Sequence, residues 1–164
     1  MSQEMETLLG ALRKELQEYA GLMQVFDEQQ RSIMGRDPAQ FLSQNAVVDE
    51  QLQKIAECRQ ARERLVRELA ARLGRPADSP LGGLLPSLPA AFQPLLRALM
   101  DEINDLIGRA HRRTQQNRML LSQSLDLARQ RLSAVDPHAL PGTYSSHGAL
   151  QGVPGRSSIP AQVA

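Results

Sequence analysis

Three carboxylates, Asp101, Glu102 and Asp105, are the residues whose spacing comes closest to an acid–base catalytic pattern. A pair of carboxyl groups can act as general acid and general base when the surroundings push their pKa values apart. A helix pairing estimated from the sequence, however, places Arg59 and Arg62 opposite this cluster. Arginines that face carboxylates indicate structural ion pairs. We therefore expect no catalytic carboxylate pair.

Histidine and cysteine give no pattern for a metal site or a nucleophile. His111 is the only histidine in a segment expected to be ordered, since His138 and His147 fall in or beside the tail. No second histidine lies one turn from it, and Cys58 is the only cysteine, whereas a zinc site needs three or four ligands. We expect Cys58 to be a small buried apolar residue. The sequence thus predicts neither an enzyme nor a bound metal or cofactor.

A basic run on one helix, Arg109, Arg112, Arg113 and Arg118, could bind phosphates. No aromatic residue interleaves these arginines, and the formal charge of the whole chain is only +1. We favour a solvated or protein-contacting face and expect no nucleic-acid partner. A nucleic-acid regulator stays as an alternative, whose binding should weaken steeply with added salt.

The elements that position these residues are three long helices. Apolar residues recur at alternating steps of four and three within residues 2–34, 37–73 and 90–135. A mean step of 3.5 is typical of a coiled-coil seam rather than of the broader stripe of a globular surface helix. The sequence therefore predicts an all-α fold, an elongated antiparallel three-helix bundle with helices over about those ranges.

Local signals bound the first two helices. Gly35 is the expected C-terminal cap of the first, and Gly74 that of the second. Asp37 is the expected N-terminal cap of the second helix, with Pro38 at its first position and Gln40 at capping-box spacing. Because only two residues separate the two helices, they must form an antiparallel hairpin.

Two segments lie outside the helices. The linker 75–89 carries four prolines, but its leucines predict that it lies over the end of the bundle: Leu81, Leu84, Leu85 and Leu88. The tail 136–164 is rich in Pro, Gly and Ser and cannot bury enough apolar surface to fold alone. We expect a bundle over 1–135 and a flexible, mostly disordered tail.

Composition bounds the compartment. The single cysteine suits a reducing cytoplasm, and the acidic amino end lacks the pattern of a secretion signal. No apolar run approaches the roughly 20 residues that span a bilayer. We expect a cytoplasmic protein with no membrane insertion.

Polar residues interrupt the helical seams, and the estimated pairing of the second and third helices gives them partners. This pairing places Asn45 near residues 117–119, and it places Arg59 and Arg62 opposite the carboxylates named above. Apolar residues in 117–135 cover more than one side of the third helix. Either both other helices pack there, or one strip is an exposed ridge for a partner helix.

The order and spacing of these residues resemble the FlgN-type flagellar export chaperones. In that family the long last helix ends with an Asn, a Leu-Leu and a Ser-Leu, and a Tyr…Gly motif follows in the tail. The matching positions here are Asn117, Leu120, Leu121, Ser124, Leu125, Tyr144 and Gly148. The resemblance covers about residues 8–148 and gives no account of the extension beyond Gly148.

The resemblance implies a cytoplasmic type III export chaperone. Its clients would be the hook-associated proteins of the hook–filament junction, bound through their C-terminal helices, kept from premature polymerisation and delivered to the flagellar export gate. The client-binding positions that it implies are Asn117, Leu120, Leu121, Ser124, Leu125 and Tyr144. The alternative from another class is a coiled-coil scaffold, in which the same apolar strips form a homo-oligomer.

Overall fold

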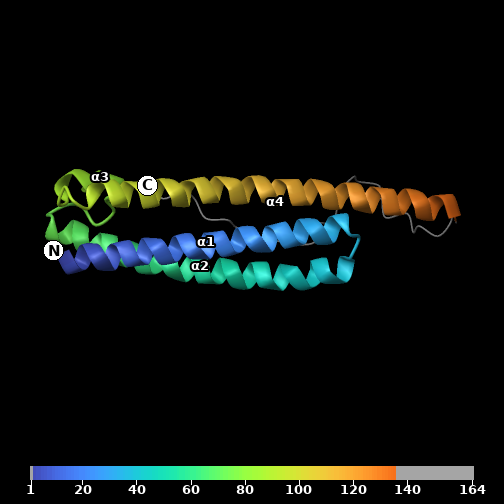
Figure 1. Ribbon diagram of the computed structural model, residues 1–164, viewed down its shortest axis with the longest axis horizontal. Coiled ribbons are helices and arrows are strands. Elements are labelled where there is room, and N and C mark those ends of the chain that lie inside the picture. Colours follow the sequence, from blue (N-terminus) through green and yellow to red (C-terminus); the bar gives the residue numbers. More distant parts are fainter. Residues whose placement is uncertain (1, 136–164) are drawn as a thin grey trace, which may run out of the picture.

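The computed structural model describes residues 2–135, which form three long α-helices and a short helical connection (Figure 1). Helix α1 spans Ser2–Met34, α2 spans Pro38–Arg72 and α4 spans Gln93–Val135. Between α2 and α4 lie the one-turn helix α3 (Leu81–Leu84) and the 3-10 turn η1 (Leu85–Ser87). The described residues contain no strand, so the predicted all-α class is confirmed.

Helix α1 is the central element. Figure 1 shows α2 returning along one side of α1 and α4 running along the other side in the direction of α1. Helix α1 packs against both, whereas α2 and α4 have almost no close backbone contact with each other. Buried positions such as Leu8 and Leu9 are neighbours in the sequence, about 100° apart around the helix, which gives α1 two packing sides.

The connection between α1 and α2 follows the local chemistry of its residues. A carboxylate oxygen of Asp37 accepts a hydrogen bond from the backbone N–H of Gln40 at 2.9 Å, and Pro38 begins the helix, as predicted. The residue with a left-handed backbone conformation in this connection is Arg36, with φ of 56°, and not Gly35.

Gly74, with φ of 65°, ends α2 as expected, and the N–H of Arg75 closes the turn by donating to the carbonyl of Ala70.

The core is aliphatic, with Tyr19 and Phe26 as its buried aromatic residues. The leucines of the connection between α2 and α4 belong to it: Leu81, Leu84, Leu85 and Leu88 are at most 4% exposed. The connection therefore packs against the bundle, as these leucines indicated. The expected tail, 136–164, lies outside the described residues.

Candidate partner-binding surface

Helix α4 presents one apolar stripe to α1 over the first part of its length. Its buried members are Leu96, Leu99, Met100, Ile103, Ile107, Ala110 and Asn117. These residues follow the 3–4 spacing of a coiled-coil seam, which keeps them on one side of the helix. After Asn117, no described residue of α4 is buried.

Polar contacts join α4 to the last turns of α1. The side-chain amide of Asn117 donates a hydrogen bond to the carbonyl of Phe26 at 3.0 Å, inside the interface. Arg113 pairs with Asp27 at 2.9 Å and also donates to the side chain of Gln30. These bonds fix the axial position of α4 relative to the last two turns of α1.

Helix α4 extends past the end of α1 because it is longer, 43 residues against 33. Figure 1 shows its last turns projecting beyond the connection between α1 and α2. Since Asn117 is level with Phe26 and both helices rise equally, the last residue of α1 is level with about residue 125 of α4. We call the α4 residues past this point the overhang.

An apolar strip begins on the last turns of α4 that α1 covers and continues along the overhang. Its members, which we call the overhang strip, are Leu121, Leu125, Ala128, Leu132 and Val135. Leu125 is 50% exposed, Leu132 55% and Val135 86%. The strip continues the stripe that α1 covers, because its 4–3–4–3 spacing stays on the same side of the helix. Large apolar side chains thus reach solvent where α1 no longer covers them.

Five of the six residues predicted from the family resemblance lie between Asn117 and Leu125, the stretch of α4 beside the last two turns of α1. Asn117 is 5% exposed and belongs to the interface with α1. Leu120, Leu121 and Ser124 are half-buried, and Leu121 and Leu125 both belong to the overhang strip. Tyr144 lies outside the described residues. Four of the six positions therefore lie together where α1 ends.

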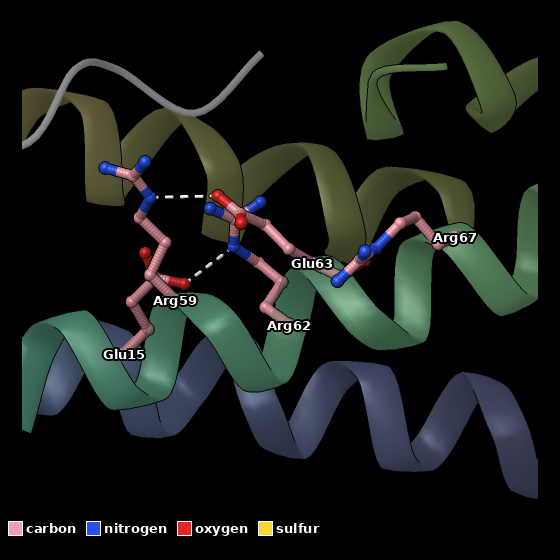
Figure 2. A network of polar contacts seen from close by, with 5 residues as sticks. All are labelled: Glu15, Arg59, Arg62, Glu63 and Arg67. Atoms are coloured by element: carbon pink, nitrogen blue, oxygen red, sulfur yellow. Dashed lines mark hydrogen bonds and ion pairs between the residues drawn. The ribbon is translucent and has the colours of Figure 1, made fainter. Parts of the chain in front are cut away.

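The ion pairs predicted between the second and third long helices are wrong. Figure 2 shows Arg62 directed at Glu15 of α1, with Nε 2.7 Å from Oε2, and Arg59 directed at Glu63 of its own helix. The reason is that α2 packs on α1 and not on α4. The predicted partner of Asn45 is wrong as well, because the Asn45 side chain accepts a bond from Gln29 of α1 at 2.9 Å.

The acidic and basic clusters do not build a site. Asp101, Glu102 and Asp105 are all exposed, and Asp105 lies 3.9 Å from Arg109 of the same helix. The basic run is also divided, because Arg113 is engaged with α1. Arg113 therefore does not extend the exposed face formed by the other three arginines.

Cys58 is buried and burial raises the pKa of its thiol. A raised pKa leaves less of the reactive thiolate, which is consistent with the predicted role as a small apolar residue. Within residues 2–135, no three His, Cys, Asp or Glu side chains are grouped to hold a metal ion. In the same range, none of the helices is long and apolar enough to cross a membrane.

Sequence reasoning missed two features of this arrangement. The buried Glu15 was not singled out, although it lies in the apolar stripe three residues after Leu12 and four before Tyr19. The overhang was not anticipated either. The signal for it was the difference in length between the first and third helical patterns.

Comparison with known proteins gives one match at the family level. The family described as FlgN protein matches residues 1–152, which is nearly the whole chain and includes all of α1, α2 and α4. No curated protein and no solved structure matches the chain.

Proposed function

The chain belongs to the FlgN family of flagellar export chaperones, and on this premise we propose that its clients are the hook-associated proteins of the hook–filament junction. It binds their C-terminal helices in the cytoplasm, prevents premature polymerisation and delivers them to the type III export gate. The family is one of chaperones, so this function requires no catalytic residue.

The observation that carries this proposal is the overhang strip. A client helix that polymerises through an apolar face must cover that face until export, and a matching apolar face on the chaperone can do so. Leu125 and Leu132 are exposed by 50% and 55% on a helix whose earlier turns use the same side for packing. Exposed apolar strips of this kind are typical of interaction sites.

We assign the family's binding positions to two parts of the chain. Leu120, Leu121, Ser124 and Leu125 contact the client directly at the boundary of α1. Asn117 belongs to the same site but acts from within the interface with α1, because its bond to Phe26 fixes the position of α4 along α1. Tyr144 contributes from the tail 136–164, which we propose to be a client-binding segment that orders on binding.

The whole chain then acts as an elongated three-helix body, with α1, α2 and α4 alternating in direction, and a tail. Helices α1 and α2 hold α4, and the end of α4 carries the client. The client helix packs on the turns of α4 that α1 does not reach. Binding therefore buries the apolar face of the client and requires no chemical step.

The test uses a purified junction protein, with and without its C-terminal helix, and measures binding by calorimetry. We expect the intact client to bind the full chain and the shortened client not to bind. The Leu121→Ala/Leu125→Ala variant should bind weakly, whereas Leu95→Ala should bind normally, because Leu95 is an exposed leucine near the other end of α4. Equal binding by both variants would refute the site.

A coiled-coil scaffold is the second candidate, since the overhang strip could also join copies of this chain. Sedimentation of the full chain at low concentration distinguishes the two. A monomer that binds the client one to one supports the chaperone. A stable homo-oligomer that loses its contacts in the Leu121→Ala/Leu125→Ala variant supports the scaffold.

A further inference from the structure

The overhang strip has a defined angular position on α4. With about 100° of turn per residue, its five members lie within about 40° of the centre of the stripe that packs on α1. A helix seated on the strip would therefore lie where α1 would continue if it were longer. The surface is thus shaped for one helix in line with α1.

Two arginines flank the strip. By the same geometry, Arg129 lies about 80° to one side of its centre and Arg131 about 80° to the other. In a coiled coil these are the positions that face the charged edge residues of the partner helix. Both side chains are exposed.

On the side of α4 that carries the strip, no carboxylate within residues 2–135 neutralises either arginine. Arg129 lies 3.7 Å from Asp126, but both side chains are more than 60% exposed, and such pairs contribute little. Asp126 is about 140° from the centre of the strip, on the far side of the helix. Arg131 makes no ion pair or hydrogen bond with another residue in the range 2–135.

We propose, on the basis of the function proposed above, that the overhang strip selects an amphipathic helix whose apolar stripe is flanked by carboxylates. The apolar residues of that helix cover Leu125 and Leu132. Its flanking Asp or Glu residues pair with Arg129 and Arg131. The apolar contact supplies most of the affinity, and the charges select the partner and its register.

The same charges disfavour a second copy of this chain as the occupant. If two overhangs paired in antiparallel fashion, Arg129 would face Arg129 and Arg131 would face Arg131. In a parallel pair, Arg129 would face Arg131. Every arrangement places like charges along both edges, which opposes self-association.

The test uses two synthetic peptides of about 20 residues with one shared leucine stripe, long enough for several helical turns. One carries Glu at both flanking edges and the other carries Lys. Binding to the full chain is measured at low salt by fluorescence anisotropy. We expect the Glu peptide to bind about fivefold more tightly, since two exposed ion pairs form in one case and two repulsive contacts in the other.

The decisive variant is Arg129→Glu/Arg131→Glu. It should reverse the preference, so that the Lys peptide binds more tightly. The matched control is Arg97→Glu/Arg112→Glu, which changes two exposed arginines on the same helix outside the overhang and should leave the preference unchanged. In about 1 M NaCl, where the Debye length is about 3 Å, the preference should disappear while binding persists.

The outcomes separate this inference from the proposed function. Equal binding of both peptides, lost in Leu121→Ala/Leu125→Ala, would refute the charge selection and leave the chaperone site standing. Failure of both peptides to bind would refute the helix site itself. A stable dimer that releases the peptides, or binding seen only after removal of 136–164, would show another occupant and overturn the proposal.

Discussion

Glu15 of α1 and Arg62 of α2 form an ion pair inside the bundle, with Oε2 and Nε 2.7 Å apart and side-chain exposures of 0% and 8%. Tyr19 lies one turn further along α1 and is also buried. Among residues 2–135, neither Oε1 of Glu15 nor the hydroxyl of Tyr19 has a hydrogen-bond partner. The packing of α1 on α2 thus contains a polar cluster that is only partly satisfied.

The first prediction concerns this ion pair. Arg62→Met should lower the free energy of unfolding by about 3–5 kcal/mol, because it leaves the Glu15 carboxylate buried without its partner. The double variant Glu15→Leu/Arg62→Met should be as stable as the original or more so, since it removes the cost of burying both charges. Chemical denaturation followed by circular dichroism measures both.

The matched control is Arg59→Met, which removes the Arg59–Glu63 contact on the surface of α2. Both side chains of that pair are more than a third exposed, so the change should be below about 1 kcal/mol. If the double variant were as unstable as Arg62→Met alone, the pair would contribute more than it costs and the interpretation would be wrong.

The second prediction concerns pH. Burial, and then the negative charge of Glu15, raise the pKa of Tyr19 from 10.0 to about 12. Between these values the folded state holds a proton that the unfolded state has lost, so stability falls as pH rises from about 10 to 12. The loss due to Tyr19 should be about 2–3 kcal/mol, and Tyr19→Phe should remove it.

Absorbance titration of the phenol provides the direct measurement. The chain has two tyrosines, so the Tyr144→Phe variant leaves Tyr19 as the only one. Its folded-state titration should have a midpoint well above that of the unfolded chain in denaturant. Coincident midpoints would mean that solvent reaches the hydroxyl of Tyr19.

The third prediction compares two leucines. Leu125→Ala should cost less than about 1 kcal/mol of stability, since the side chain is already half in solvent, yet should weaken client binding. Leu12→Ala, at a fully buried position of α1, should cost about 2–5 kcal/mol. Thermal unfolding and calorimetry on the same samples separate the two effects. A large loss of stability in Leu125→Ala would place the overhang strip inside the fold.

Local chemistry made parts of the fold predictable from the sequence. Asp37 and Pro38 define the start of α2 through contacts within four residues, and Gly74 defines its end through its own backbone conformation. Such signals do not depend on which helices meet. The all-α class follows equally directly from the apolar spacing.

The choice of partners between helices was not predictable in the same way. The estimate placed Arg62 opposite the carboxylates of the last helix because it paired α2 with α4, although Glu15 lies in the packing stripe of α1 and the carboxylate cluster is exposed. A seam spacing says that a helix packs, but not on which neighbour. The overhang depends on the same information, because it exists only once α1 and α4 are aligned through Asn117 and Phe26.

The last prediction concerns Asn117. Its amide N–H donates to the carbonyl of Phe26, while its Oδ1 has no hydrogen-bond partner within the described range 2–135. Asn117→Ala should cost about 1–2 kcal/mol through the lost bond and the space left behind. Asn117→Leu should cost less, because it fills that space with apolar volume and removes the unsatisfied oxygen.

The client affinity of these variants, measured well below their unfolding temperatures, decides how Asn117 serves the site. Since its side chain is 5% exposed, Asn117 can reach a client only if α1 and α4 separate near Phe26. We expect Asn117→Leu to weaken client binding less than Leu125→Ala does, because it loses only the bond that aligns α4 with α1. Loss of binding in a fully folded Asn117→Leu chain would mean instead that the client displaces the end of α1 and contacts Asn117 directly.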